Sequence, residues 1–324
     1  MDHLSTILIN QPGLLNSTID KERKNTANNN DDDNKVEEQD MIQFPKWIST
    51  ALAARRFQIM DNHVKLLDQD ITEIDVLNIF YQMIQNDTSI CQKIKLDNAM
   101  YIIPPNSAFF MGDLENINDL LLYEMNKNSY DLVVMDPPWP NKSVHRSLKY
   151  ETQDIYEFYK IPLPSFIHDQ SLVAVWVTNK PKFKKFIIDK LFRSWNITVI
   201  AEWIWVKVTN HGETVIPIDS THRKTYEQLI IGKYQSKDTL VESSPLSPII
   251  PYHHAIISVP SKQHSRKPPL QDVLSPYLSS NPRCLELFAR CILPGWTSFG
   301  SEVLKFQHEA YFLENREENK PINT

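Results

Sequence analysis

The chain has 324 residues, of which 41% are hydrophobic and 10% aromatic, enough for one large α/β domain with extensions or for two modest domains. No apolar run approaches the ~20 residues of a membrane span, and the start lacks the features of a signal peptide. Its three cysteines suggest neither a disulfide framework nor a metal cluster. We therefore expect a soluble intracellular protein without a membrane anchor.

The net charge of −6 does not by itself indicate a nucleic-acid-binding protein. Residues 20–40 hold eight acidic and four basic residues, which leaves the rest of the chain with a net charge of about −2. Basic residues gather at 180–185, 222–224 and 262–267, so local positive surfaces are expected. For 180–185 a solvated helix face is the favoured interpretation, with phosphate binding as the alternative.

The glycine content excludes the usual nucleotide-binding loops. The six glycines form neither G-x-G-x-x-G nor the P-loop pattern. A nucleotide-like cofactor must therefore be held in another way.

The N-terminal part divides into two predicted segments. Residues 1–40 include a polar stretch rich in Asn and Asp and are predicted to be disordered and of low complexity. Residues 41–98 are predicted to form a mainly helical extension. Within 72–87 the apolar residues recur at helical spacing, and Thr72 with Asp75 resembles a capping box.

From about residue 100, apolar strands alternate with helices, which favours a mostly parallel α/β sheet with helices on both faces. We predict the main domain at 99–316 and a flexible tail at 317–324. The candidate substrate loops are the long connections at 140–165, 207–225 and 235–252. The predicted strands are 100–105, 107–113, 130–139, 171–179, 195–209, 225–234, 253–260 and 284–289, and the predicted helices are 114–127, 180–192 and 270–278.

The segment "DLVVMDPPWP" at 131–140 places Asp136 at the carboxyl end of a buried strand, where ligands bind in such sheets. Asp136 accepts hydrogen bonds, and Pro137 and Pro138 offer carbonyls without N–H groups, on a stiff backbone. An exocyclic amine suits these acceptors, and Trp139 would offer a π-face to its base ring. The alternative is a rigid proline turn in which Trp139 fills the core.

The "DPPW" motif, followed by "NKSVHRS", resembles the MT-A70 family of adenine-N6 methyltransferases. The later blocks "VAVWVTN", "AEWIWVKVTNHGE", "HRKTYEQLIIG", "HSRKPPLQDVL" and "LELFARCILPGWTSFGSEVLKFQ" follow in the family's order. The resemblance covers roughly residues 100–312, and the residues of its motifs are most similar to those of the methyltransferase-like protein 4 branch.

The resemblance implies a Rossmann-like fold that binds S-adenosylmethionine, without a metal, and in which the catalytic block precedes the main cofactor block. Asp136 and the Pro137 carbonyl would hold the two amine hydrogens, and Pro138 and Trp139 complete the catalytic motif. The amine lone pair would then point in line at the methyl group. Whether Asp136 also accepts a proton is left open, because orientation and electrostatic stabilisation can suffice.

The family's cofactor residues carry over position by position. Lys267 would pair with the methionine carboxylate. Glu302 and Ser301 would bind the ribose hydroxyls, with Arg290 nearby. Asp113 and Leu114 would meet the adenine. Each has an ordinary alternative as a surface or turn residue, and together they favour the cofactor site.

Two positions depart from the family pattern. Ser301 stands where the family usually has asparagine, so weaker cofactor binding is expected. Thr225 stands where the branch usually has proline, which is expected to loosen the substrate loop. The predicted substrate contacts are Asn141, Lys142, Lys224, Tyr226 and Glu227.

The resulting hypothesis is an adenine-N6 methyltransferase acting on nucleic acid in the nucleus. RNA is preferred, including 2′-O-methylated adenosine in small nuclear RNA, and DNA adenine is the other candidate. A protein partner and a monomer are equally compatible with the sequence. The alternatives are a non-catalytic nucleic-acid-binding scaffold, and a methyltransferase for the amine of cytosine or of a protein amide.

Overall fold

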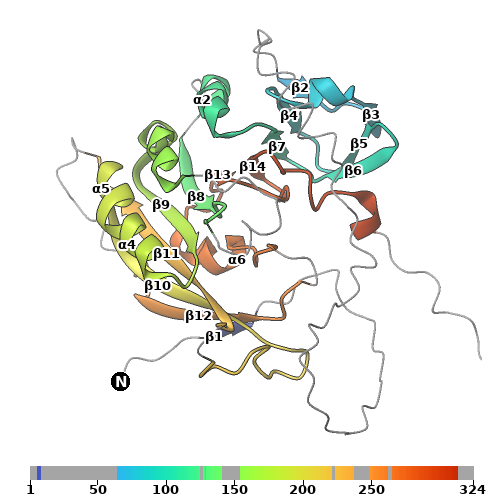
Figure 1. Cartoon of the computed structure of the whole chain (residues 1–324). Helices are drawn as coiled ribbons and strands as arrows, with labels where there is room; N and C mark the ends of the chain where they lie inside the picture. The colour runs from blue at the N-terminus through green and yellow to red at the C-terminus, as the bar shows by residue number, and fades with distance from the viewer. Residues whose placement is uncertain are drawn as a thin grey trace, which may run out of the picture.

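The computed structural model describes residues 6–8, 64–124, 127, 129–140, 154–220, 223–236, 248–261 and 265–312. An 11-stranded sheet forms the centre of this part of the chain, with the order β1-β12-β10-β11-β9-β8-β13-β14-β7-β4-β2 (Figure 1). Its strands are β1 (Thr6–Leu8), β2 (Lys65–Leu66), β4 (Met83–Asn86), β7 (Ser107–Phe110), β8 (Tyr130–Met135), β9 (Ile167–Val177), β10 (Ile197–Lys207), β11 (Tyr226–Tyr234), β12 (His253–Ser258), β13 (Cys284–Leu287) and β14 (Trp296–Phe299).

Strand direction decides which side chains meet at one edge of the sheet. β8 runs parallel to β9 and β13, and β14 runs parallel to β13 and β7. β11 lies antiparallel between β9 and β10. The carboxyl ends of the parallel strands therefore share an edge with the beginning of β11.

Alternation along the strands gives the sheet two apolar faces. In β8, Val133 and Met135 pack into one core with residues of the helices on that side, and Leu132 and Val134 pack into a second core. The helical segments that cover the first face are α2 (Ile117–Glu124), the 3-10 turns η3 (Ile155–Lys160) and η4 (Leu163–Ser165), and the continuous stretch α4 (Pro181–Phe186), η5 (Ile187–Leu191) and α5 (Phe192–Ser194). α6 (Gln271–Leu274) covers the second face and is continued by η6 (Ser275–Tyr277).

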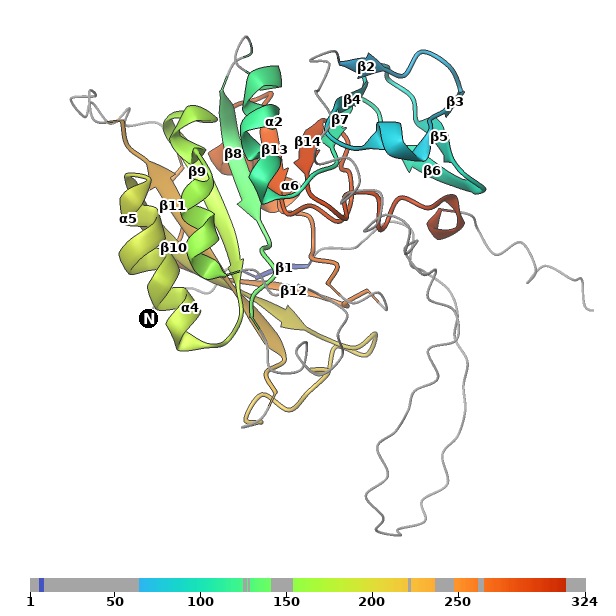
Figure 2. The same ribbon diagram turned by 45° about the horizontal axis from the view of Figure 1, so that its top comes forward.

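The predicted fold class is confirmed: the sheet is mostly parallel and has helical segments on both faces (Figure 2). β14 was not predicted, although it lies between β13 and β7. It is only four residues long, and all four are buried, so it lacks the alternation that marks a half-exposed strand. None of the helices in the described ranges is long and apolar enough to cross a membrane.

The helical prediction for residues 72–87 is wrong, and so is a mainly helical extension over its described part, 64–98. This region forms strands and one 3-10 turn. Asp75 caps that turn by accepting from the Leu77 N–H at 2.8 Å. β4 pairs with β7, which buries Met83 and Ile84 on opposite sides of the strand, a pattern that one helix stripe cannot give. The elements are β3 (Ile71–Glu73), η1 (Val76–Ile79), β5 (Gln92–Leu96) and β6 (Ala99–Ile103), the strands forming a small second sheet.

The predictions for residues 1–40 and 317–324 lie outside the described residues, apart from β1. The boundaries proposed for the domains stay predictions. The remaining helical segments, η2 (Leu114–Asn116) and η7 (Glu309–Tyr311), follow β7 and β14 in the chain.

Candidate active site

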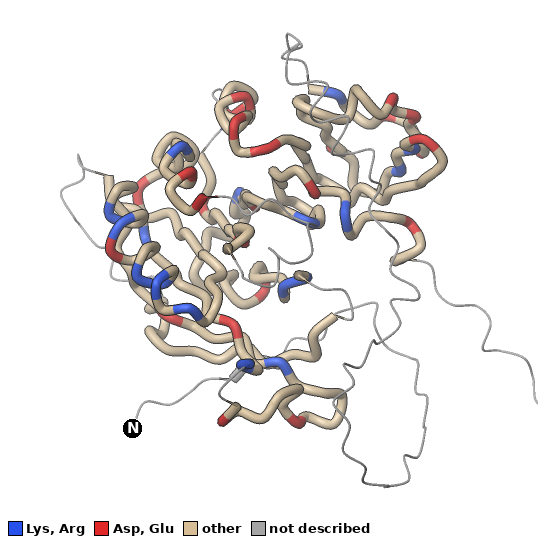
Figure 3. The backbone as a smooth tube through the Cα atoms, viewed as in Figure 1, with Lys and Arg blue, Asp and Glu red and all other residues tan. Residues whose placement is uncertain are grey.

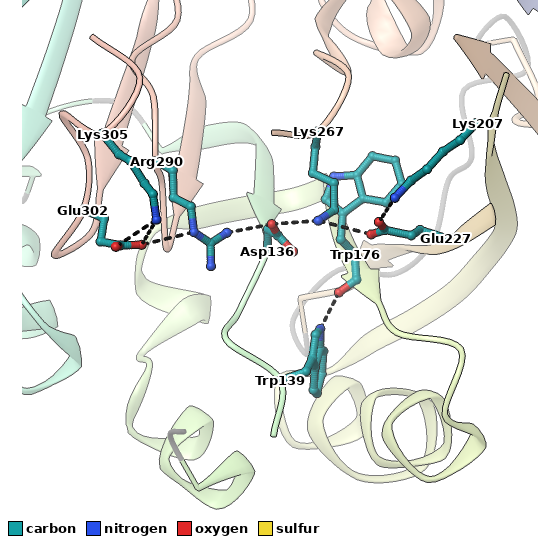
Figure 4. Close-up of polar contacts among 9 residues, drawn as sticks. All are labelled: Asp136, Trp139, Trp176, Lys207, Glu227, Lys267, Arg290, Glu302 and Lys305. Carbon is teal, nitrogen blue, oxygen red and sulfur yellow. Dashed lines mark hydrogen bonds and ion pairs between the residues drawn. The ribbon is translucent and has the colours of Figure 1, made fainter. Parts of the chain in front are cut away.

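Charged side chains from five parts of the chain converge at the shared edge of the sheet (Figure 4). Asp136 directly follows β8, and Arg290 follows β13. Glu302 follows β14, and Glu227 is the second residue of β11. Lys267 comes from the segment between β12 and α6. The strand directions explain why residues up to 166 positions apart in the chain meet here.

Asp136 lies between two cations. Its Oδ2 is 3.0 Å from Nζ of Lys267 and 2.8 Å from Nη1 of Arg290. Both ion pairs use the same oxygen, which leaves Oδ1 as the oxygen that can face a substrate. The side chain of Asp136 is only 11% exposed, so its position is set by these partners.

The ion pairs extend on both sides of Asp136. Lys267 Nζ lies 3.1 Å from Oε2 of Glu227, whose Oε1 is paired with Lys207 at the end of β10. Arg290 Nε lies 3.4 Å from Oε2 of Glu302, and Lys305 lies 3.0 Å from Oε1 of the same carboxylate. Positive and negative groups alternate along this row, so each charge taken from water has an opposite charge beside it.

Burial and charge act against each other in this row. Burial alone would raise the pKa of Glu227, but Lys267 and Lys207 outweigh it and the pKa is lowered. Burial alone would lower the pKa of Lys267, but Asp136 and Glu227 outweigh it and the pKa is raised. The pKa of Arg290 is also raised, because the negative charges of Asp136 and Glu302 outweigh the effect of burial, which alone would lower it. Glu227, Lys267 and Arg290 are therefore charged near neutral pH.

Glu286 of β13 is the exception. Burial, with the negative charge of Asp136 as the second cause, raises the pKa of Glu286 to about 8. This carboxyl therefore changes its charge near neutral pH, close to the row of ion pairs. No sequence pattern marks Glu286, because it is a single acid inside an apolar strand.

Gly300 allows β14 to approach the loop that follows β13. A Cβ at Gly300 would lie 2.7 Å from the Ala289 carbonyl oxygen and 2.9 Å from the Ala289 nitrogen, both backbone atoms. The Gly300 N–H donates to the Phe110 carbonyl of β7 at 3.2 Å. Glycine is therefore required here for close packing, and this packing places Ser301 and Glu302 beside Arg290.

The predicted stacking role of Trp139 is wrong. Its ring is 9% exposed and packs against Phe158 at 5.8 Å and Phe183 at 5.0 Å between ring centroids. Its indole N–H donates to the Trp176 carbonyl at 2.9 Å, and in Figure 4 the ring points away from Asp136. Trp139 therefore fills the core and fixes the loop that follows β8, which was the alternative interpretation. Its backbone N–H donates to the Pro137 carbonyl at 2.8 Å, and that oxygen has a second lone pair.

The predicted cofactor residues lie at the same edge, with different degrees of access. The Asp113 carboxylate accepts from the Glu115 N–H at 3.1 Å and caps η2 after β7. The Leu114 side chain is 5% exposed and packs in the core, so its backbone is the part that can contact a ligand. Ser301 is exposed. Arg290 was expected only near the cofactor, and it contacts Asp136 directly.

The predicted substrate residues divide into two groups. Glu227 lies in the row of ion pairs, and the Tyr226 carbonyl accepts from Asn179 after β9 at 2.6 Å. Lys224 instead donates to the Ser220 carbonyl of its own loop at 2.7 Å and is exposed. The structure therefore brings Glu227 into contact with the site, leaves Tyr226 beside it in β11, and does not bring Lys224 to Asp136. Asn141 and Lys142 lie outside the described residues.

Thr225 anchors its loop, contrary to the expected loosening. It is fully buried, and its hydroxyl donates to the Lys207 carbonyl at 2.9 Å. The Lys207 N–H donates to the Thr225 carbonyl at 2.8 Å. Lys207 and Lys305, which were not predicted from the sequence, complete the row. A basic residue at the end of a strand and another after a glycine turn would have been the signal for them.

The set of side chains at the edge fits S-adenosylmethionine by its chemistry. Lys267 is a cation suited to a carboxylate, and Glu302 and Asp113 are acceptors suited to hydroxyl and amino groups. Of the residues assigned from the family, Lys267 and Arg290 contact Asp136, and Glu302 contacts Arg290. The family's assignments stay predictions for this chain.

Comparisons with known proteins identify the family of the chain and several relatives. The MT-A70 family matches residues 130–302. The human protein "N(6)-adenine-specific methyltransferase METTL4" is 41% identical over 256 residues, 78% of this chain and 54% of that protein.

Two further relatives differ in the polymer that they are named for. The "N6-methyladenosine RNA methyltransferase MTA1" of Pyricularia oryzae is 36% identical, over 66% of this chain and 57% of its own length. The "DNA N6-methyl methyltransferase" of Caenorhabditis elegans is 34% identical, over 68% of this chain and 57% of its own length. This chain thus spans about half the length of human METTL4. On the family match, which covers more than half of the chain, this protein belongs to the MT-A70 family.

Proposed function

We propose that this protein transfers a methyl group from S-adenosylmethionine to the N6 amine of adenine in a nucleic acid. The observation that carries the proposal is the acceptor pair at the end of β8. Oδ2 of Asp136 is held by Lys267 and Arg290, so Oδ1 and the second lone pair of the Pro137 carbonyl are the acceptors that would take the hydrogens of a substrate amine. Two acceptors on a stiff backbone match the two hydrogens of an exocyclic amine.

The residues of the chain act by orientation. Accepting both amine hydrogens turns the nitrogen lone pair out of conjugation with the ring and towards the methyl donor. As the nitrogen bonds the methyl group and the methyl–sulfur bond of the donor breaks, the nitrogen becomes positive, and the Asp136 carboxylate stabilises that charge. The surplus N–H proton then passes to Asp136 or to solvent, which leaves the neutral methylated amine. Lys267 and Arg290 fix the carboxylate beforehand, so little reorganisation is needed during the reaction.

When bound, S-adenosylmethionine supplies an electrophilic methyl group on a sulfonium. Lys267 would hold its carboxylate, Glu302 and Ser301 its ribose hydroxyls, and Asp113 with the Leu114 backbone its adenine. Because Lys267 also contacts Asp136 and Glu227, the cofactor and substrate sides of the site share one cation.

The proposal extends to RNA as the preferred polymer, in a single-stranded or looped region. Relatives named for RNA and for DNA methylation support the nucleic-acid class without choosing between the polymers. A base inside a duplex must first be flipped out, which favours single strands. An adenosine carrying a 2′-O-methyl group and a nuclear location are parts of the proposal that rest on the sequence resemblance alone.

The test is methyl transfer from isotopically labelled S-adenosylmethionine to matched RNA and DNA oligonucleotides. Each RNA is made with and without a 2′-O-methyl group on the target adenosine, and products are analysed as nucleosides. The proposal expects label in N6-methyladenine, with RNA giving the higher rate. Label in methylcytosine would contradict the adenine assignment. Cofactor binding without any label would favour a missing protein partner, and neither binding nor label would favour a non-catalytic scaffold.

A further inference from the structure

We propose that η3 and the α4–η5–α5 helical stretch form a platform for single-stranded nucleic acid beside the catalytic loop. The inference rests on the proposed function, since it names the surface that would hold the polymer around the target base. The surface, called here the Tyr–Lys surface, consists of Tyr156, Tyr159, Lys182 and Lys190.

Two exposed tyrosines supply aromatic faces. Tyr156 is 54% exposed and Tyr159 is 42% exposed, and their rings stack with centroids 6.4 Å apart and an interplanar angle of 20°. Phe186 of α4 supports both rings edge-on, at 5.7 Å and 5.9 Å. Exposed, ordered rings of this kind are the groups on which unpaired bases stack.

The neighbouring helix supplies positive charge. Residues 180–194 hold six basic residues and one acid, Asp189, and the basic positions gather along α4 to α5 in Figure 3. Lys184 is neutralised by Glu202. Lys190 lies over the Tyr156 ring at 5.7 Å, and Lys182 lies over the Phe183 ring at 4.8 Å. Cations beside stacked rings match a strand that alternates phosphates with bases.

The Tyr–Lys surface connects to the reaction centre through the buried Trp139. Its ring contacts Phe158, which lies between the two tyrosines in η3, and Phe183, which follows Lys182 in α4. Lys180 Nζ donates to the Pro140 carbonyl at 3.2 Å, at the end of the catalytic loop. The elements that carry the Tyr–Lys surface are thus packed against the loop that follows Asp136, and the core position of Trp139 joins the two.

These observations favour nucleic acid over an acidic protein as the occupant. An acidic protein would use the lysines but has no need of two stacked, exposed rings. The positive charge was visible in the sequence, where a solvated helix face was the favoured interpretation. The tyrosines change that interpretation, because the fold places them against the same helix.

Binding of the full chain to fluorescent single-stranded and duplex oligonucleotides, measured by anisotropy at several salt concentrations, tests the platform. Tyr156→Ala/Tyr159→Ala should weaken single-strand binding by about 5- to 100-fold. Tyr156→Phe/Tyr159→Phe should restore it, because the rings remain. Lys182→Gln/Lys190→Gln should reduce the slope of log affinity against log salt by about 1.4.

The matched control is Lys93→Gln/Lys95→Gln, which removes the same charge from two half-exposed lysines of the small sheet. It should bind as the unaltered protein does, and thermal melts show that each variant is folded. Unchanged binding in both the tyrosine and the Lys182/Lys190 variants would overturn the platform. It would also be overturned if polyglutamate competed with the oligonucleotide as well as unlabelled single strands do, which would assign the surface to an acidic protein.

This test separates the platform from the proposed function. Binding is measured without S-adenosylmethionine, and methyl transfer is measured separately on the same oligonucleotides. An unaltered chain that binds single strands through the Tyr–Lys surface but methylates none of them would contradict the proposed function alone. In an active chain, the tyrosine variant should raise KM for long oligonucleotides far more than for those trimmed to the target nucleotide.

Discussion

Arg290 joins Asp136 to Glu302: its Nη1 lies 2.8 Å from Oδ2 of Asp136, and its Nε lies 3.4 Å from Oε2 of Glu302. One planar guanidinium thus links the residue proposed to hold the substrate amine with a residue proposed to hold the cofactor. A lysine at this position would have to reach both carboxylates with one nitrogen, whereas the guanidinium of Arg290 offers each carboxylate a separate nitrogen in a fixed geometry. The two halves of the site are therefore expected to depend on each other through this side chain.

Arg290→Lys should lower kcat/KM by about 10- to 100-fold, because one charge-assisted hydrogen bond is lost. The loss should appear in both the cofactor KM and kcat. Arg283→Lys is the matched control, since Arg283 pairs with Glu124 away from the row of ion pairs. Equal kinetics for Arg290→Lys and the unaltered protein would show that the bridge has no role.

Lys267→Gln should weaken binding of S-adenosylmethionine by about 10- to 100-fold, as expected for the loss of a hydrogen bond to a charged group. Lys207→Gln removes the same charge one carboxylate further along the row and should change affinity by less than about threefold. Isothermal calorimetry measures both. Equal losses in the two variants would mean that overall charge, and not contact with Lys267, governs cofactor binding.

Glu286→Gln tests the titration near neutral pH. Because the pKa of Glu286 is raised from its ordinary value of 4.5 to about 8, folding takes up a proton between these values. The free energy of unfolding should therefore fall as pH rises from about 4.5 to about 8, by at most about 1.4 kcal/mol per pH unit from this group. The variant should lose this contribution and be the more stable protein at pH 9.

Denaturant unfolding across this pH range measures the effect. Glu73→Gln is the control, since Glu73 is a largely exposed acid of the small sheet. It should leave the pH dependence unchanged. A Glu286→Gln variant with the same pH profile as the unaltered protein would contradict the raised pKa.

Gly300→Ala should destabilise the fold by about 1–3 kcal/mol, because its Cβ would lie within 3.0 Å of two backbone atoms of Ala289. Gly212→Ala provides a contrast, since a Cβ there meets no atom within 4 Å and its φ of +82° supplies the only cost. The melting temperature and the affinity for the cofactor should both fall in Gly300→Ala. A neutral result would mean that β14 can move away from Ala289 freely.

The sequence was sufficient for strands β7 to β13 of the sheet and for the acid at its edge. Long apolar strands such as β8 and β9 carry their own signal, and strand direction then places Asp136, Arg290 and Glu302 together. The helical prediction for the N-terminal region failed for a physical reason. Met83 and Ile84 satisfy a helical spacing, but they belong to a strand that is buried by pairing with β7. Long-range pairing of this kind has no local signature.

Side-chain roles were harder to predict than positions. Trp139 could serve either as a stacking face or as part of the core, and only its packing on Phe158 and Phe183 decides between them. Thr225 was judged by what it replaces, whereas its hydroxyl bond to Lys207 is what holds the loop. Glu286 was missed because its unusual pKa comes from neighbours distant in sequence.

The central claim is that the Asp136 carboxylate orients the substrate amine, and it is tested most directly by single-turnover methyl transfer with Asp136→Asn. Asp131→Asn is the matched control, at the opposite end of the same strand and bonded to Arg283 and Ser279. We predict that Asp136→Asn binds S-adenosylmethionine and melts cooperatively, yet forms N6-methyladenine at least about 100-fold more slowly. Asp131→Asn should retain most of the activity. A folded Asp136→Asn variant that methylates adenine at close to the unaltered rate would contradict the account.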